Sequence, residues 1–397
     1  MVGSRWRWLH LRRLQLDAKQ VRRNRHCRYY GLAGKAARLQ FAGWQCGARR
    51  WVCLECGHWL SARTGTAYAG IRISERIFRD GIRQLAEGAS IRTVGRNIEC
   101  DKDTVSHWLP RVGRHCLRLI HYFFRNLHLT ECQLDELWTF VYKKEDHLTV
   151  FEKLARRYGD TWIWTAFDPV HKLVPAWRVG KRTLTDAQTF IKALKSRLDC
   201  HIPFFTSDDL PHYAEALLAV YGMLVTPPRR FKQGRPPSPY LQVPTDLVYA
   251  VVIKKKEHGH LVEIATRIIY GTEAQVVACL RASPISKAIS TWGVERNNLT
   301  VRQHSRRLTR RVNAFSKKRV YLKYQLALAF AFYHFCCPHR GLREKLEPPI
   351  PTKNGHGSPK HWRQVTPAMA AGLTDHVWTL DELLSFRVPP RSRWTMP

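Results

Sequence analysis

Carboxylates are scarce in this chain, and the few that gather in short groups constrain what it can fold into. Of its 397 residues, 66 are Lys or Arg and only 31 are Asp or Glu. Three acidic groups stand out, at 134–138 (LDELW), 206–209 (TSDD) and 294–298 (VERNN). Their first acids are Asp135, Asp208 and Glu295, each within or at the end of a predicted element, where an uncompensated charge is costly. Acids gathered inside a cationic protein suit divalent cations, since hard cations take oxygen ligands.

The basic excess indicates an acidic partner. The formal net charge is +35 and the isoelectric point is near 10.3, which is typical of proteins that bind nucleic acid. Between Pro284 and Lys323 there are eleven Lys or Arg and a single acid, Glu295. A solvated surface without a partner is the alternative, and the concentration of charge disfavours it. Charge alone does not separate DNA from RNA.

Composition also bounds the class of protein. A hydrophobic fraction of 44% and 14 Trp favour a folded chain, and the length suits two or three domains. There is no apolar run of about 18 residues, so we expect no membrane span. The Arg-rich segment from Arg5 to Arg25 has no apolar core of signal-peptide length, so we do not expect secretion. We therefore expect a cytoplasmic, nucleoid-associated protein. Its eleven cysteines are expected to be reduced thiols or metal ligands.

The first 70 residues predict a basic arm (1–21) followed by a small zinc-ribbon-like module (22–70). Cys53 and Cys56, with Gly57 after them, have the spacing of a knuckle that directs two thiolates at one Zn²⁺ ion. Upstream, Cys27 is the clearest partner, and His26 or Cys46 could supply the fourth ligand. A degenerate ribbon without zinc, held together by its tryptophans, is the alternative.

Residues 71–120 predict a helix-turn-helix domain that binds double-stranded DNA. Caps at Ser74 and Ser90 begin the first two helices, and Asp103 begins a third. Val105, Trp108, Leu109 and Val112 share one face of that third helix, which we expect to enter the major groove. Its candidate DNA contacts are Lys102, Thr104, Ser106 and His107. A three-helix core without DNA contact is the alternative, and Gly95 and Pro110 weaken the pattern.

Residues 128–345 predict an α/β catalytic domain with a mixed sheet, followed by a C-terminal tail (346–397). Three strands are expected at 132–142, 161–167 and 173–179, then a helix at 185–198, a strand ending at Asp208, a helix at 211–221 and a strand at 223–225. An insertion is expected at about 227–285, with a hairpin of strands 247–254 and 261–269. A basic helix at about 294–312 and an apolar helix at 321–335 complete the domain.

The three acids can converge at one edge of this sheet. Two Mg²⁺ ions held there would clamp the attacking and leaving oxygens of a phosphodiester. Glu295, Asn298, Arg302 and Arg306 lie at offsets 0, 3, 7 and 11, which is one face of the predicted helix. Each acid also has a structural alternative: Asp135 as a surface residue of an edge strand, Asp208 as a cap of the helix beginning at Pro211, and Glu295 as a helix-start acid.

The chain resembles a bacterial insertion-sequence DDE transposase of the insertion-sequence-one type. The matching stretches are LDELWTFV at 134–141, TSDDLPHYAEAL at 206–217 and, above all, VERNNLTVRQHSRRLTRRVNAFSKK at 294–318. The ribbon, the helix-turn-helix and the tail TPAMAAGLTDHVW at 366–378 are also similar. The resemblance implies a ribonuclease H-like catalytic fold, with Asp135, Asp208 and Glu295 as metal ligands and Asn298 beside them. The family pattern has a second cysteine close to the first in the upstream half of the ribbon. The two positions around Cys27 where that cysteine could stand hold Asn24 and Tyr30 instead, so this sequence departs from the pattern there.

The sequence therefore predicts a transposase that binds terminal inverted repeats and cuts and joins DNA with Mg²⁺ or Mn²⁺. It would act as a homo-oligomer, since two element ends must be brought together. Further DNA contacts are expected from the basic segment, at Arg302, Arg306, Arg307, Arg310 and Arg311. A DNA-binding relic or repressor without catalysis is one alternative. A ribonuclease H-like nuclease or resolvase is the other.

Overall fold

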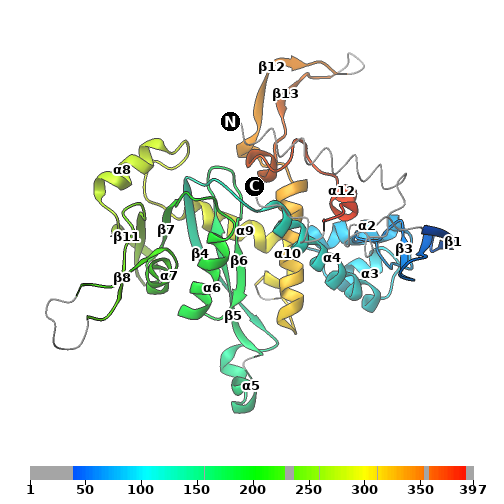
Figure 1. Ribbon diagram of the computed structural model, residues 1–397, viewed down its shortest axis with the longest axis horizontal. Coiled ribbons are helices and arrows are strands. Elements are labelled where there is room, and N and C mark those ends of the chain that lie inside the picture. Colours follow the sequence, from blue (N-terminus) through cyan, green and yellow to red (C-terminus); the bar gives the residue numbers. More distant parts are fainter. Residues whose placement is uncertain are drawn as a thin grey trace. The chain divides into compact units, whose positions relative to one another are not determined.

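The structure is a computed structural model that describes residues 39–155, 157–228, 237–258, 260–310, 312–352 and 357–389. The chain divides into two compact units, one drawn from Met1–Tyr122 and Ala327–Met396 and the other from Phe123–Leu326 (Figure 1). The prediction of an α/β protein is confirmed. The expected arm at 1–21, His26 and Cys27, and Arg311 lie outside the described residues. Among the helices that are described, none is long and apolar enough to cross a membrane.

The predicted ribbon region contains a three-stranded antiparallel sheet of β1 (Leu39–Gln45), β2 (Ala48–Cys53) and β3 (Trp59–Ser61). The knuckle lies between β2 and β3. There the amide of Gly57 donates to the carbonyl of Cys53 (2.9 Å), and Gly57 has a positive φ of 67° that favours glycine. The turn geometry expected of the Cys53–Cys56 knuckle is therefore present, while zinc binding stays a prediction.

Cys46 does not lie near this knuckle, so the suggestion that it supplies a fourth zinc ligand is wrong. It sits in the tight turn between Gln45 and Ala48, whereas Cys53 pairs with Leu39 at the opposite end of the same hairpin. Five residues of extended strand separate the two ends by roughly 17 Å. Sulfur ligands of one zinc ion each lie about 2.3 Å from it.

Three helices follow, as the caps predict: α2 (Glu75–Ala86), α3 (Ile91–Asn97) and α4 (Lys102–Phe123). The hydroxyls of Ser74 and Ser90 accept hydrogen bonds from the third amide of α2 and of α3. The four apolar residues expected on one face of the third helix are all buried: Val105, Trp108, Leu109 and Val112. The indole of Trp108 packs edge-on against Phe78 of α2, with ring centroids 5.2 Å apart.

Gly95 and Pro110 do not interrupt these helices. A Cβ on Gly95 would lie 2.7 Å from the carbonyl oxygen of Cys100, so glycine lets the turn before α4 close against α3. The helix α4 continues through Pro110 without a break. Both residues are therefore compatible with the three-helix arrangement.

The C-terminal tail belongs to the same unit. It contains a hairpin of β12 (Glu344–Ile350) and β13 (Lys360–Arg363), then α11 (Pro367–Ala370) and α12 (Leu380–Ser385). Asp381 of α12 accepts a hydrogen bond from the Tyr68 hydroxyl (2.6 Å), and the amide of Ala67 donates to the carbonyl of Leu384 (2.8 Å). The tail therefore helps to build the unit that contains the three helices.

The other unit is organised around a six-stranded mixed sheet, of order β11-β10-β7-β4-β5-β6. Its strands are β4 (Glu131–Val141), β5 (Gly159–Phe167), β6 (Trp177–Gly180), β7 (Phe204–Asp208), β10 (Tyr249–Glu257) and β11 (His260–Tyr270). Neighbours β4, β5 and β6 are antiparallel, β7 and β10 run parallel to β4, and β11 is antiparallel to β10. Between β4 and β5 lie the short helices η2 (Glu145–His147) and α5 (Val150–Leu154).

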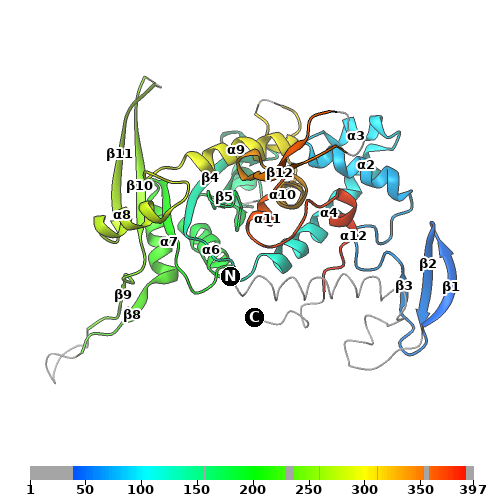
Figure 2. The ribbon, with the colours of Figure 1, turned by 90° about the horizontal axis from the view of Figure 1, so that it is seen from above.

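Helices cover both faces of this sheet (Figure 2). On one face α6 (Leu184–Lys195) and α7 (Pro211–Tyr221) bury Phe190, Tyr213 and Leu217 against Leu134 and Phe205 of the strands. On the other face lie α8 (Glu273–Ala282) and α9 (Trp292–His304); Val276 of α8 packs on β7 and β10, and α9 packs on β4 and β5. A strand of this sheet therefore presents alternate side chains to two different helical layers.

Two expected elements differ from the structure. The strand expected at 223–225 forms as β8 (Met223–Val225), but it pairs with β9 (Tyr240–Gln242) in a separate two-stranded sheet. The fifth strand of the main sheet is instead β10, which we expected inside an insertion. The reason is burial: Ala250 and Val251, on opposite faces of β10, are both buried, as a strand covered on both faces requires, whereas Leu224 is exposed.

The expected helix over 294–312 ends early. The helix α9 stops at His304, Ser305 is extended (φ −134°, ψ 99°), and a short 3₁₀ turn η3 (Arg306–Leu308) follows. The turn lets Leu308 reach the core, where it is 4% exposed. Arg306 is therefore not on the helix face that carries Glu295. The apolar helix expected at 321–335 is α10 (Arg319–Cys336).

Candidate functional site

The strand register brings Asp135 and Asp208 together. The parallel strands β4 and β7 pair Leu134 with Ser207, so the next residues, Asp135 and Asp208, stand at the same level on adjacent strands. The carboxyl ends of parallel strands lie at one edge of a sheet, where ligands commonly bind in α/β proteins. The sequence could indicate this edge only because each acid ends or interrupts an apolar run.

Both acids face the helical layer that contains α9. Side chains two residues apart point to the same face of a strand. Asp135 therefore faces the same side of the sheet as Gln133, and Asp208 the same side as Thr206. The amide of Val294 donates to Gln133 Oε1 (2.8 Å), and the hydroxyl of Thr206 donates to the carbonyl of Ser290 (3.2 Å). The segment entering α9 is thus bonded to both strands beside the two acids.

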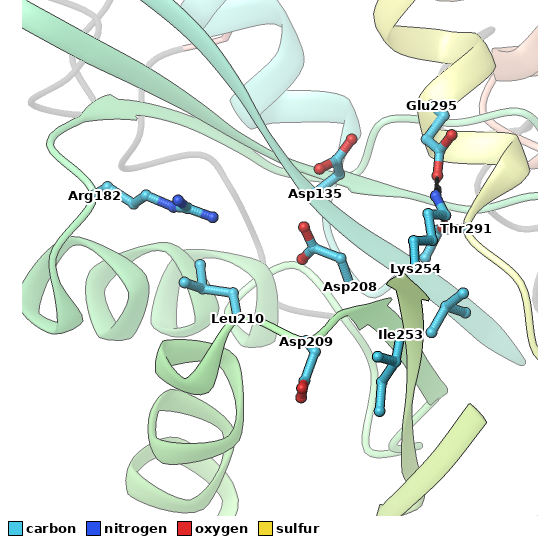
Figure 3. A pocket seen from close by; sticks show the side chains of 10 residues that line it. Asp135, Arg182, Asp208, Asp209, Leu210, Ile253, Lys254, Thr291 and Glu295 are labelled. Atoms are coloured by element: carbon cyan, nitrogen blue, oxygen red, sulfur yellow. Dashed lines mark hydrogen bonds and ion pairs between the residues drawn. The ribbon is translucent and has the colours of Figure 1, made fainter. Parts of the chain in front are cut away.

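The acids open into a pocket of about 570 Å³, a size typical of ligand sites. Figure 3 shows the carboxylates of Asp135 and Asp208 close together, with Glu295 and Lys254 on one side and Arg182 on the other. Asp135, Glu136 and Asp208 each offer an oxygen atom, and these three oxygens lie within 4.8 Å of one another. In the part of the chain that the structure describes, this is the only such group of three potential metal-ligating side chains.

Glu136 was not among the predicted site residues. It follows Asp135 directly and therefore points to the opposite face of β4, where neighbours such as Leu134 are in the core. Its side chain is 2% exposed, and its carboxylate accepts hydrogen bonds from Arg182 (2.5 Å) and from the Tyr213 hydroxyl (3.0 Å). A glutamate at an apolar position of the strand was the sequence signal for it.

The crowding of acids alters their titration. Burial, together with the nearby Asp208 carboxylate, raises the pKa of Asp135 to about 6. Burial and the same neighbour raise the pKa of Glu136 to about 7. Burial also raises the pKa of Asp208 above its usual range. Such shifts mark a site where negative charge is under-compensated, which a bound cation would relieve.

Glu295 lines the same pocket from the first turn of α9 but lies outside the closest group of three oxygens. Its Oε1 accepts hydrogen bonds from the ammonium group of Lys254 on β10 and from the hydroxyl of Thr291 (2.7 Å). The side chain is 48% exposed. It therefore stands at the mouth of the pocket, and its position in the first helical turn also suits the helix dipole.

Asn298 joins α9 to the strand acids. Its Nδ2 donates to Asp135 Oδ2 (2.6 Å), while the amide of Glu136 donates to Oδ1 of the same carboxylate (2.8 Å). Asp208 differs, because its Oδ1 is buried without a hydrogen-bond partner among the described residues. A buried carboxylate oxygen in this state is unfavourable unless something binds it.

Two structural alternatives for the acids do not hold. Asp135 is on β4, in the middle of the sheet, and not on an edge strand. The residue before α7 is Leu210, and no side chain caps that helix. Asp209 borders the pocket, but it pairs with Arg267 (2.6 Å) and its carboxylate points away from those of Asp135 and Asp208 (Figure 3). Asp208 is therefore available to the pocket.

The predicted DNA contacts fall into several groups. In the three-helix unit Lys102, Thr104 and His107 are exposed at the start of α4, and Ser106 is half-buried. In the basic segment Arg306 and Arg310 are exposed. Arg302 and Arg307 are half-buried, and they donate to the Leu308 carbonyl (3.5 Å) and the Ser316 hydroxyl (3.4 Å). Each of these two arginines therefore also has a hydrogen-bond partner within the protein, and their contact with DNA stays a prediction.

Comparison with known proteins assigns the chain to no family. No protein-family model matches the chain, and no curated protein matches it significantly.

Proposed function

We propose that the chain is a DNA transposase that binds the terminal inverted repeats of an insertion sequence and cleaves and transfers DNA strands. The observation that carries the proposal is the pocket. Two acids from adjacent parallel strands, Asp135 and Asp208, meet there with Glu295 of α9, in a protein of net charge +35. An acidic pocket in a basic protein suits chemistry on a polyanion.

The strand order supports a ribonuclease H-like catalytic fold. Three consecutive antiparallel strands, β4, β5 and β6, lie on one side, and β7 and β10 extend the sheet beyond β4 and parallel to it. The resemblance to insertion-sequence transposases implies a fold of this kind, with Asp135 and Asp208 as metal ligands. Asp135 lies on the first strand of the sheet in chain order, and Asp208 is the last residue of the fourth.

The donor set fits a hard divalent cation, Mg²⁺ or Mn²⁺. Asp135 and Asp208 would hold it, because their oxygens are close together and Oδ1 of Asp208 has no hydrogen-bond partner among the described residues. When bound, such an ion polarises phosphoryl oxygens and makes water a stronger nucleophile at neutral pH. Glu295 lines the same pocket and is a further oxygen donor at its mouth.

The chain's own residues would perform the remaining tasks. Asn298 fixes the Asp135 carboxylate, and Thr291 and Lys254 fix Glu295. Lys102, Thr104 and His107 at the start of α4 are exposed and would contact a duplex during recognition of the element ends. Because two ends must be cut together, the active form would be a homo-oligomer.

A comparison of substrates tests the proposal. Full-length protein with Mg²⁺ or Mn²⁺ is expected to nick duplex DNA that carries the inverted repeats flanking its coding region, and to leave RNA–DNA hybrids and four-way junctions largely uncut. The variant Asp208→Ala should not nick. Preference for hybrids or junctions would favour the nuclease or resolvase alternative. Specific end binding with no cleavage under any metal would favour the repressor alternative.

A further inference from the structure

Arg182 and Lys181 are adjacent cations with different surroundings. Both lie between β6 and α6, whose first helical residue is Leu184. Lys181 donates to Glu145 (2.8 Å) and to the carbonyl of Tyr158 (3.3 Å), and it does not line the pocket. Arg182 lines the pocket, and its guanidinium reaches toward Asp208 and Asp135 (Figure 3).

The guanidinium of Arg182 is held in one orientation. It donates to Glu136 Oε1 (2.5 Å), and its central carbon lies 4.9 Å from the centre of the Trp162 ring. Glu136 is itself fixed, because its other oxygen accepts from Tyr213. The Glu136 side chain is only 2% exposed, and burying a carboxylate is costly in free energy. A role in holding Arg182 would explain why an acid is kept at this buried position.

The hydrogen bond to Glu136 occupies only one of the N–H donors of Arg182. A guanidinium carries five N–H donors in a rigid fork, and its hydrogen bond to Glu136 comes from Nη2. The side chain is 42% exposed, on the side of the pocket opposite Lys254. A fixed guanidinium that is open to a pocket matches the geometry of a phosphate group.

We propose that Arg182 binds a phosphate of the nucleic-acid strand that enters the pocket, and that Glu136 and Trp162 are positioning residues for it. The inference rests on the proposed function, because it assumes a nucleic-acid strand at the two acids. It assigns Glu136 to the arginine and leaves Asp135 and Asp208 as the cation ligands. A purely structural Arg182, which only neutralises the buried acids, is the competing explanation.

Salt dependence separates these explanations. Each phosphate contact contributes about one unit to the slope of log binding constant against log salt concentration. With a fluorescent 20-base-pair duplex and Ca²⁺ to suppress cleavage, Arg182→Ala should lower this slope by about one. The matched control Lys181→Gln removes the same charge from the adjacent residue and should leave the slope unchanged.

A second pair of variants tests the positioning. Arg182→Lys keeps the charge but loses the fork and the aromatic contact, so it should keep the slope while cleavage at saturating DNA falls at least about tenfold. Glu136→Gln keeps the shape of the side chain that orients Arg182 but weakens its hold, so its cleavage rate should lie between those of the parent and Arg182→Lys. Tb³⁺ luminescence checks that both variants still bind a cation.

The inference is overturned if Arg182→Ala matches the parent in slope and in cleavage. It is also overturned if Arg182→Ala loses cation binding and thermal stability while its slope stays unchanged, since that result marks a structural arginine. A failure of the proposed function would give a different result. In that case the parent cuts no DNA with any metal, yet the slope of log binding constant against log salt concentration still differs between the parent and Arg182→Ala.

Discussion

At the scale of single residues, the site depends on two neighbours that face opposite ways. Asp135 points to the layer of α9, where Asn298 holds it, and Glu136 points to the layer of α6 and α7, where Tyr213 holds it. Successive side chains of a strand point to opposite faces of the sheet, so these two neighbouring residues contact different helical layers. Substitutions at the two positions should therefore have separable effects.

The raised pKa values of these acids predict a pH dependence of stability. Between the ordinary pKa values near 4 and the folded-state values of about 6 and about 7, the folded protein binds more protons than the unfolded chain. The free energy of unfolding of metal-free protein should therefore fall as pH rises from about 4 to 7. Removing one of these acids by Glu136→Gln should make this fall smaller.

Urea denaturation in EDTA, at several pH values from 4.5 to 7.5, measures that effect as the difference between parent and variant. The comparison with the variant is needed because buried His115, in the other unit, changes the free energy of unfolding with pH in the opposite direction. Burial lowers its pKa to about 4, so it adds stability that is lost as pH falls below about 6.5. Identical pH slopes for parent and Glu136→Gln would contradict the prediction.

Lys254 should oppose cation binding, because its ammonium group lies in the same pocket and holds Glu295. Lys254→Met removes that repulsion, which is roughly 1 kcal/mol even with the screening of bulk water, so Mn²⁺ should bind at least about fivefold tighter. The neighbouring Lys255→Met is the control, since Lys255 pairs with Glu257 (3.5 Å) and does not line the pocket. Calorimetric titration with Mn²⁺ measures both, and weaker binding by Lys254→Met would refute the expectation.

At the scale of elements, the position of α9 decides whether its residues reach the strand acids. A Cβ added to Gly293 would lie 2.7 Å from Gln133 Oε1 and 3.1 Å from the ring of Phe167. Glycine at the start of α9 therefore permits the close approach to β4 and β5 that brings Asn298 to Asp135.

Gly293→Ala should displace α9. The overpacking is expected to cost about 1–3 kcal/mol of stability and to weaken Mn²⁺ binding, because Asn298 and Glu295 move with the helix. Leu299→Ala is the control, since Leu299 is 55% exposed on the same helix. Thermal unfolding and Mn²⁺ titration measure the two effects. A Gly293→Ala protein with parental stability and Mn²⁺ affinity would show that the helix does not need this contact.

The elements also show how far the sequence could predict this molecule. Local signals were sufficient for α7, whose predicted bounds match the structure, and for the caps at Ser74 and Ser90. Pairing between distant segments has no local signal, so β10 was not expected in the main sheet. Asp135 and Asp208 were identifiable because Asp135 interrupts an apolar run and Asp208 ends one. Glu136 had a sequence signal, as an acid at an apolar strand position, but its pairing with Arg182 was not predictable, because the two residues are 46 apart along the chain.

The helix α12 should be essential to the unit that carries α2, α3 and α4. Leu383 is fully buried, and the imidazole of His115 hydrogen-bonds its carbonyl (2.8 Å). Leu383→Ala is expected to destabilise this unit by about 2–5 kcal/mol and to impair binding to inverted-repeat DNA. Leu54→Ala, at an exposed position of the same unit, should have little effect. Limited proteolysis and DNA binding check the prediction, which fails if Leu383→Ala behaves as the control does.

At the scale of the whole molecule, the excess of positive charge should dominate the affinity for DNA. A protein that makes six to ten phosphate contacts loses about 10³- to 10⁵-fold in affinity between 50 and 200 mM salt. We expect a loss of this size from a chain of net charge +35. Fluorescence anisotropy with a random duplex measures it, and a nearly salt-independent affinity would exclude a backbone-dominated interface.

The central claim is that Asp208 serves a cation-dependent cleavage site, and its neighbour Asp209 allows a matched test. Asp209 borders the pocket, but it pairs with Arg267 and its carboxylate points away from that of Asp208 (Figure 3), so Asp208→Asn and Asp209→Asn remove equal charge one residue apart. The decisive measurement is the rate of Mn²⁺-dependent nicking of a supercoiled plasmid that carries the element ends. We predict near-parental nicking by Asp209→Asn and a loss of at least about a hundredfold, near 2.7 kcal/mol, in Asp208→Asn. Equal nicking by the two variants would contradict the account.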